Sequence, residues 1–403
     1  MVLILAGVVS TACGVATVLL YRSAKRRRAL GSARTVITAN LLLIVMLASA
    51  AFGALDAYFR FGYEGTDNFG ATPATVEWLQ KYYHMNNWNW RDNVDYAAAS
   101  PAGKTRITFL GDSSTEGAGI KDVDQRFGNL IRNQNPDRYD VQVFARGGNS
   151  TGKELRDLLD AYRGQGYSTD IVVVVYDLND ATDLSASYLR WERSGYERTR
   201  AAIERPWVQS SALLTMLVAR WEGARNLDIG EYAKLLEQGC QGLDWQKQLL
   251  RLRLLHDLCV SQGAQMVLVS LPSHYPAIET LLNEWCREFE VPFLGLQSVF
   301  DADPTASWHV SEADGHPNER AHAAFAARIE PLLATISVPT AKAPKQSNFE
   351  EIAALCKLDW CDSVAVFKAM GKYLEAHGDH ERATKVYSFA TEASGQVAKA
   401  PPN

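Results

Sequence analysis

Short, continuously apolar runs alternate with amphipathic stretches between residues 105 and 335 of this 403-residue chain. The run 171–176 has no polar residue to face water. Strands of this kind are buried on both faces, so the pattern predicts a parallel sheet between two layers of helices. The expected strands are 105–110, 141–145, 171–176, 265–271 and 292–296, and the expected helices are 124–133, 153–162, 245–262, 278–289 and 318–333.

Polar motifs follow the predicted strands. Gly111-Asp112-Ser113 comes after the first strand, Gly148 after the second and Asn179-Asp180 after the third. In parallel sheets, active sites form beyond the carboxyl ends of the strands, so these residues are expected to lie together. Asp314-Gly315-His316-Pro317-Asn318 opens the last predicted helix and adds an Asp/His base. A serine nucleophile, an amide donor and a base are the groups that acyl transfer needs.

These four motifs, in this order, resemble the motif blocks of the SGNH (GDSL-type) hydrolase superfamily over residues 105–335. The resemblance implies a flavodoxin-like three-layer sandwich around a central parallel sheet. It implies that Ser113 is the nucleophile, that His316 is its general base and that Asp314 orients the imidazole. The oxyanion hole would consist of the backbone N–H groups of Ser113 and Gly148 and the side-chain amide of Asn179. Neither a cofactor nor a metal is implied.

Two positions depart from the family pattern. Asp177 stands where the third block usually has glycine, and Asp314 lies two residues before His316, whereas three is commoner. The closer spacing resembles that of membrane-anchored members that work in the acylation of cell-surface polymers. If this pair is not the base, His309 and His322 are the substitutes, although no motif supports either of them.

Other polar residues have structural interpretations. For Asp112 and Asp180 we expect helix capping and loop hydrogen bonds, and Asn179 has the alternative of a turn residue. Of six cysteines, Cys356 and Cys361 are close enough in sequence for a small disulfide in an oxidising compartment. A further pair is open among Cys240, Cys259 and Cys286. No cysteine has the spacing of a zinc site.

Two charge-free runs, residues 2–21 and 35–55, flank a basic segment at 22–34. Each run has the roughly 20 residues that a helix needs to cross a bilayer. Because short basic loops stay in the cytoplasm, residues 1–60 are predicted to anchor the chain in the cell (inner) membrane, with the remainder periplasmic or extracytoplasmic. Insertion of the second run alone gives the same location. The competing interpretations are a cleaved signal peptide and a buried soluble hairpin.

The exported part is expected to contain a hydrolase-like domain over 64–335 with a helical insertion at 182–240. That insertion covers the site, docks a partner or is a structural elaboration. A linker at 336–346 leads to a helical hairpin over 347–394 and a disordered tail at 395–403. The hairpin resembles one tetratricopeptide repeat, with a simple hairpin as the alternative. One repeat cannot bury its own face, so it is expected to pack on the main domain or on a partner.

The favoured function is a membrane-anchored extracytoplasmic serine esterase that removes acyl groups, such as acetyl, from a glycan or lipid. The alternative is an O-acyltransferase of a cell-surface polysaccharide that uses the same triad with a membrane acyltransferase partner. A second alternative is a non-catalytic assembly protein. The expected partners are the lipid bilayer, the acylated glycan or lipid and a membrane protein. Nucleic acid is not expected, because the net charge is -5 and no basic stripe interleaved with aromatic residues occurs outside the N-terminal region.

Overall fold

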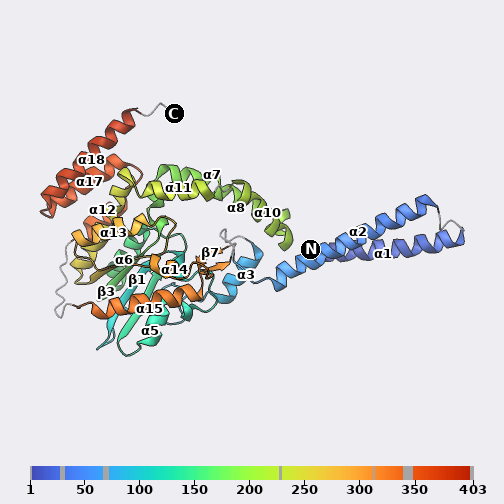
Figure 1. The fold of residues 1–403 in the computed structure, drawn as a ribbon, viewed down its shortest axis with the longest axis horizontal. Helices are drawn as coiled ribbons and strands as arrows, with labels where there is room; N and C mark the ends of the chain where they lie inside the picture. The colour runs from blue at the N-terminus through green and yellow to red at the C-terminus, as the bar shows by residue number, and fades with distance from the viewer. Residues whose placement is uncertain are drawn as a thin grey trace. The chain divides into compact units, whose positions relative to one another are not determined.

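The structure, a computed structural model, describes residues 2–27, 32–66, 72–226, 229–311, 314–338 and 348–399. The chain divides into two compact units (Figure 1). One comprises residues 1–81 and 192–228, and the other comprises residues 82–191 and 229–403. The predicted domain boundaries remain predictions, and the predicted site residues all belong to the second unit.

A five-stranded parallel sheet forms the centre of the second unit, as predicted (Figure 1). Its strands are β1 (Thr105–Gly111), β2 (Tyr139–Ala145), β3 (Ile171–Tyr176), β4 (Gln265–Ser270) and β5 (Phe293–Gly295), in the order β2-β1-β3-β4-β5. Along β3, Val172 and Val174 belong to the hydrophobic cluster on one face, and Val173 and Val175 belong to the cluster on the other. Both faces are therefore dry, which is why this run is continuously apolar.

Helices cover both faces of the sheet and complete three layers. One face packs against α5 (Phe127–Gln134) and α15 (Glu319–Thr335). The opposite face packs against α6 (Thr151–Gln165), α12 (Gly242–Ser261) and α13 (Ala277–Glu288). The expected helices are confirmed in type, with ends that differ by a few residues.

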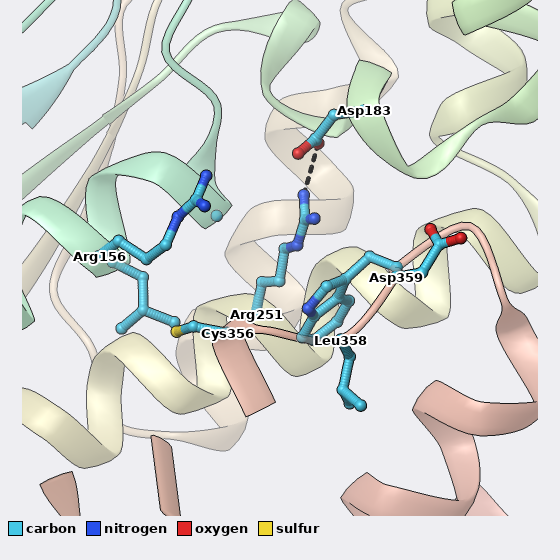
Figure 2. Close-up of a pocket in the computed structure, with 9 residues that line it drawn as sticks. Arg156, Asp183, Arg251, Cys356, Leu358 and Asp359 are labelled. Carbon is cyan, nitrogen blue, oxygen red and sulfur yellow. Dashed lines mark hydrogen bonds and ion pairs between the residues drawn. The ribbon is translucent and has the colours of Figure 1, made fainter. Parts of the chain in front are cut away.

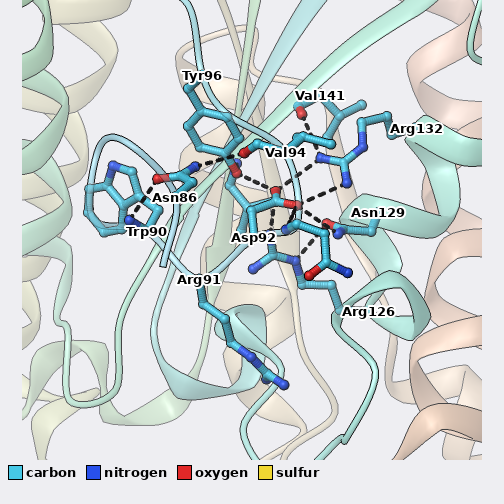
Figure 3. Close-up of polar contacts among 12 residues, drawn as sticks. Asn86, Trp90, Arg91, Asp92, Val94, Tyr96, Arg126, Asn129, Arg132 and Val141 are labelled. Carbon is cyan, nitrogen blue, oxygen red and sulfur yellow. Dashed lines mark hydrogen bonds and ion pairs between the residues drawn. The ribbon is translucent and has the colours of Figure 1, made fainter. Parts of the chain in front are cut away.

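A buried ionic cluster around Asp92 holds residues 84–96 against α5 and β2 (Figure 3). The Asp92 carboxylate accepts hydrogen bonds from Arg126 at 2.8 Å, from both guanidinium ends of Arg132 at 3.0 Å and from the Tyr96 hydroxyl at 2.6 Å. Burial by itself would raise the pKa of Asp92, but these partners outweigh it and lower the pKa to about 2. Residues 84–96 are therefore held in place before the chain enters β1.

Residues 314–317 form a strand before the helix and are not part of it, which corrects the prediction that the whole motif opens the helix. Asp314–Pro317 forms β7, which pairs antiparallel with β6 (His309–Ser311). Asn318 is the N-cap of α15, and its side chain accepts the backbone N–H of Ala321 at 3.0 Å. The apolar periodicity of α15 begins only after this cap. The two strands before it are too short to leave a periodic signal in the sequence.

The C-terminal segment packs on the main domain, one of the two expected possibilities. The helices are α16 (Phe349–Cys356), α17 (Ser363–Ala376) and α18 (His380–Lys399), and they share a hydrophobic cluster with α6 and α12. Residues 395–399 continue α18, so the tail predicted to be disordered is helical to Lys399, and residues 400–403 lie outside the described chain. Most of the predicted linker, 339–346, also lies outside it. The likeness to a tetratricopeptide repeat remains a prediction.

The first unit contains the N-terminal helices and part of the insertion. Helix α1 (Val2–Arg26) and helix α2 (Ala33–Ala57), which continues into a π-turn at Tyr58–Gly62, are long and apolar enough to cross a membrane. The insertion is helical, as predicted, and its elements are α7 (Ala186–Ser194), α8 (Tyr196–Ile203), α9 (Pro206–Gln209), α10 (Ala212–Asn226) and α11 (Ile229–Gly239). Of these, α8, α9 and α10 belong to the first unit and α11 to the second.

Candidate active site

Ser113 is the first residue of a short helix at the carboxyl end of β1. Strand β1 ends at Gly111, and Asp112 is the N-cap of α4 (Ser113–Glu116), where its side chain accepts the Ser114 N–H at 2.8 Å. The expectation that Asp112 caps a helix is confirmed. Burial raises the pKa of Asp112 although hydrogen bonds from Asn179 and Ser114 oppose the shift.

His316 joins Ser113 to Asp314. Its Nε2 lies 2.8 Å from Ser113 Oγ, a residue 203 positions away in sequence, and its Nδ1 lies 2.5 Å from Asp314 Oδ1. The same Asp314 oxygen accepts the backbone N–H of His316 at 3.1 Å, which fixes the carboxylate. Burial would lower the pKa of His316, but the hydrogen bond and charge of Asp314, with the charge of Asp112, raise it. This chain of contacts can take a proton from a serine hydroxyl.

A glycine lets the β6–β7 hairpin approach the loop after α4. Gly119 has φ +82°, and a Cβ there would lie 2.5 Å from Val310 Cγ2 and 3.2 Å from Asp314 Oδ2. Any larger residue would combine backbone strain with a clash against the hairpin that carries the base.

The expected oxyanion donors lie on elements that contact the turn bearing Ser113. Asn179 lies in η3 (Leu178–Leu184), and its Nδ2 donates to Asp112 Oδ2 at 2.9 Å. Gly148 has φ +72°, which favours glycine, and a Cβ on the preceding Gly147 would lie 3.9 Å from the Ser113 Cβ. Among the described residues, the backbone N–H groups of Ser113 and Gly148 donate to no protein acceptor. Two N–H groups and one amide can therefore serve a developing negative charge.

Comparison with known families decides the assignment of the second unit. The family model of the GDSL-like lipase/acylhydrolase family matches residues 109–324, more than half of the chain. The chain belongs to this family. Esterase or hydrolase activity is the chemistry of GDSL/SGNH proteins, and the matched residues contain every predicted site residue.

This GDSL-family chain is similar to several solved structures. A lipolytic G-D-S-L protein from Veillonella parvula is 11% identical, with a TM-score of 0.36, over 58% of this chain and 100% of the other. A two-domain esterase active on acetylated mannans is 15% identical, with a TM-score of 0.32, over 61% of this chain and 54% of the other. A GDSL-like lipase from Bacteroides thetaiotaomicron is 12% identical, with a TM-score of 0.34, over 60% of this chain and 93% of the other. No curated protein matches the chain.

Glu116 is a site residue that sequence reasoning missed. This side chain of the GDSL block is buried, and its Oε2 accepts the backbone N–H of Gly147 at 2.9 Å and the Tyr83 hydroxyl at 3.4 Å. Burial raises the pKa of Glu116, while the positive charge of Arg91 opposes the shift. Arg91 also donates to the carbonyl oxygens of Gly117 and, at 2.7 Å, Ile120. The only sequence signal was a glutamate three residues after the nucleophile.

Half-buried and buried carboxyls form a group next to Asp112 of the GDSL site. Asp177, at the position where the family usually has glycine, accepts a hydrogen bond from Ser114 Oγ at 3.1 Å. Burial and the charge of Asp112 raise its pKa to about 7. Burial also raises the pKa values of Glu154 and Asp180 well above their usual range, and neighbouring carboxyls add to the shift. Asp180 forms the predicted loop contact, since it accepts the Asp177 N–H at 2.9 Å.

Asp183, at the far end of η3, links both oxyanion loops to the core. It accepts hydrogen bonds from Ser150 Oγ at 3.0 Å and from Arg251 at 2.5 Å. Arg251 also lies over the ring of Trp360, 4.6 Å from its centroid. Asp183, Arg251 and Trp360 line a cavity of about 150 Å³, which Ser113 and His316 do not line. Figure 2 shows Asp183 and Arg251 there, joined by their ion pair. The cavity is thus distinct from the Ser113–His316 contact.

Part of the insertion lies beside η3, and its aromatic side chains pack there. The ring of Trp191 stacks on Tyr232 of α11, with centroids 5.0 Å apart, and Tyr188 lies 5.7 Å from Trp191. The second-unit portion of the insertion therefore supports the element that carries Asn179.

The alternative histidines do not reach Ser113. His322 is buried in α15, where its Nδ1 accepts the Phe127 N–H at 3.3 Å. Burial and the charge of Arg126 lower the pKa of His322 to about 3. His309 is exposed on β6, with its ring edge-on to Phe300.

The cysteines do not form the disulfides left open by the sequence. All six are free, and Cys361 Sγ instead donates to the Asp183 carbonyl. Within the described part of the chain, no group of three or more His, Cys, Asp and Glu side chains is placed to hold a metal ion.

Proposed function

We propose that this GDSL-family protein is a serine esterase in which Ser113, His316 and Asp314 form the catalytic triad. The observation that carries the proposal is the contact of His316 with both partners, at 2.8 Å to Ser113 Oγ and 2.5 Å to Asp314 Oδ1. A serine hydroxyl becomes a strong nucleophile when a neighbouring base removes its proton.

In the acylation step, Ser113 Oγ bonds to the ester carbonyl carbon as its proton passes to His316 Nε2. The resulting imidazolium is stabilised by the Asp314 carboxylate at Nδ1. Collapse of the tetrahedral intermediate breaks the ester C–O bond, and His316 returns the proton to the departing alcohol. Water then attacks acyl-Ser113 by the same route, which releases a carboxylic acid and restores the serine.

The oxyanion receives hydrogen bonds from the N–H groups of Ser113 and Gly148 and from the Asn179 amide. Two arrangements support this role. Asn179 is already oriented by Asp112 at 2.9 Å, and the loop bearing Gly148 is anchored through Gly147 to Glu116. Donors fixed before the reaction need no reorganisation when charge develops on the carbonyl oxygen.

The proposal includes an extracytoplasmic location, anchored by α1 and α2 in the cell (inner) membrane. Both helices are long and apolar, and almost none of their apolar residues are buried against the protein. The basic residues between them favour a cytoplasmic loop, which places both ends of the hairpin outside. The proposed substrate is an O-acylated glycan or lipid, acetylated in the simplest case.

Fluorophosphonate labelling of the detergent-solubilised full chain tests the triad. We expect Ser113 to be labelled in the wild type, Ser113→Ala to be unlabelled and His316→Ala to react far more slowly. Ser114→Ala is the matched control, because Ser114 Oγ contacts Asp177 and not His316. Folded wild-type protein that takes no label, or label that persists in Ser113→Ala, contradicts the proposal.

A second candidate is an O-acyltransferase in which a sugar hydroxyl replaces water at acyl-Ser113. The two apolar helices favour it, because a site held at a membrane can receive acyl groups from a membrane-protein partner. Incubation with an activated ester and an oligosaccharide separates the two functions. Acyl-saccharide formed faster than free acid supports transfer, and free acid alone supports the esterase. If Ser113→Ala leaves the cellular function intact while removal of 348–394 abolishes it, the protein is an assembly factor.

A further inference from the structure

Helix α10 is tied to the end of the second apolar helix by a buried carboxylate. Asp56, completely buried near the end of α2, accepts a hydrogen bond from Ser211 Oγ at 2.5 Å and from the Leu213 N–H at 3.1 Å. One turn further, Arg60 donates to the Ser210 carbonyl at 3.2 Å. All of these residues belong to the first unit, in which α10 also packs against α2 (Figure 1).

The position of Asp56 along the helix sets the depth of this junction. The helical segment Ala33–Gly62 has 30 residues, which at 1.5 Å per residue is about 45 Å long. The hydrocarbon core is about 30 Å thick. Residues 35–55 carry no charge, so Asp56 and Arg60 are the first charged residues past the span. If α2 crosses the bilayer, its end and the start of α10 lie at the level of the lipid headgroups.

The outward surface of α9 and α10 has the composition of a membrane interface. Trp207, Leu217 and Trp221 are 59%, 53% and 70% exposed. Leu217 and Trp221 are four residues apart and so lie on one face of α10, whereas Ala212, Met216 and Ala219 are buried. Tryptophan concentrates at membrane–water boundaries, where its ring contacts acyl chains and its N–H contacts water.

The charges beside this surface complement anionic lipid. Residues 205–226 contain Arg205, Arg220 and Arg225 and one acidic residue, Glu222. The three arginines are exposed. Long basic side chains lie along an apolar surface and extend their charged ends to phosphate groups.

We propose that α9 and α10 form a lipid-docking surface, which lies in the headgroup region of the bilayer and inserts Trp207, Leu217 and Trp221. This rests on the membrane anchoring in the proposed function and is independent of the triad. The occupant is the lipid surface, because the junction at Asp56 places these side chains beside the span and their charge matches lipid phosphate. The first-unit portion of the insertion therefore makes a second contact with the bilayer, beside the spanning helix α2.

Quenching of tryptophan fluorescence by brominated lipid tests the surface. The full chain is inserted into nanodiscs whose acyl chains are brominated near the headgroup. None of the ten tryptophans lies in α1 or α2, so quenching reports on the rest of the chain. In the wild type we expect the brominated lipid to quench the fluorescence of Trp207 and Trp221. The double variant Trp207→Phe/Trp221→Phe should show no such loss.

Trp191→Phe is the matched control, because Trp191 lies in the same insertion, half-buried against Tyr232, and its removal should leave the quenching in place. Circular dichroism of the double variant checks that it is folded. Phosphatidylglycerol in place of phosphatidylcholine should strengthen the quenching, and Arg205→Gln/Arg220→Gln/Arg225→Gln should abolish that difference.

The outcomes separate failure of the surface from failure of the anchor. If the protein co-purifies with nanodiscs but the wild type and the double variant are quenched equally, the surface is wrong and the anchor stands. The same result is expected if a protein partner covers these tryptophans. If the chain stays monodisperse in water without lipid and does not enter nanodiscs, the anchoring fails and the surface fails with it.

Discussion

The side-chain amide of Asn179 donates to Oδ2 of Asp112 at 2.9 Å, so the amide is oriented by the residue that precedes the serine. The other oxygen of Asp112 caps the helix that begins at Ser113. One buried carboxylate thus sets both the position of the hydroxyl and the direction of the amide. A second N–H of the Asn179 amide remains for an oxyanion, because an amide nitrogen carries two hydrogens.

Removal of that amide tests its role. We expect Asn179→Ala to lower kcat by about 10² to 10³, with little change in KM, because an oxyanion donor acts mainly on the transition state. Asn93→Ala is the matched control, since Asn93 also donates to an aspartate, Asp124 at 3.2 Å, away from Ser113. Steady-state kinetics on an activated ester measures both variants. Wild-type kcat in Asn179→Ala would show that Asn179 does not belong to the oxyanion hole.

Asp314 is expected to fix the tautomer of His316. In Asp314→Asn an amide NH2 that faces Nδ1 donates a hydrogen bond to it, which leaves the imidazole proton on Nε2, where the ring can no longer accept the serine proton. We expect kcat to fall by roughly 10⁴, as in other serine triads. Asp303→Asn replaces an aspartate bonded to Arg320 at 2.9 Å and should leave kcat unchanged. Near-normal kcat in Asp314→Asn would show that Asp314, two residues before His316, is not the carboxylate that orients the imidazole.

The sheet could be predicted from the sequence because its strands are buried on both faces and are therefore rich in apolar residues, most clearly in β3. Ile171–Tyr176 was predicted with the ends that the structure gives it. The motifs after the strands were expected to converge because parallel strands end at one edge, and His316 does contact Ser113. The β6–β7 hairpin could not be predicted, since its strands of three and four residues are too short for any periodicity.

The supporting contacts of the site were also beyond sequence reasoning. Glu116 anchors Gly147, and Arg251 reaches Asp183, a residue 68 positions away in sequence. Such pairs depend on how layers pack, and neither the place of Glu116 in the GDSL block nor the sequence around Arg251 indicates its partner. The division of the insertion between the two units could not be predicted for the same reason, because it depends on contacts such as that between Asp56 and Ser211, which are 155 positions apart.

The Asp92 cluster should make a large contribution to stability. Asp92→Ala leaves Arg126 and Arg132 buried without their anion, and removal of one partner from a buried pair typically costs about 3–5 kcal/mol. Asp124→Ala removes a more exposed aspartate, 3.5 Å from the same Arg132, and should cost far less. Chemical denaturation in detergent compares the two variants. Equal midpoints would show that Asp92 is not buried in this network.

Asp177 makes the activity and the stability depend on pH. Its charge contributes to raising the pKa of His316, and the base must be neutral to accept the serine proton. Asp177→Asn removes this charge while keeping the size of the side chain. We therefore expect the acid limb of the kcat/KM profile to move to lower pH. Ser114→Ala, which removes the hydroxyl bonded to Asp177 and leaves its charge, should move the limb much less.

Thermal unfolding supplies the second readout for Asp177. Burial raises the pKa of this carboxyl from 3.8 to about 7, so the folded state resists losing its proton. Stability from the protonated side chain is complete below the unfolded pKa and is lost as the pH rises through 7. Asparagine does not titrate, so the Tm of Asp177→Asn minus that of the wild type should grow from pH 4 to pH 8. A constant difference, together with an unmoved acid limb, would show that Asp177 is neither buried nor coupled to His316.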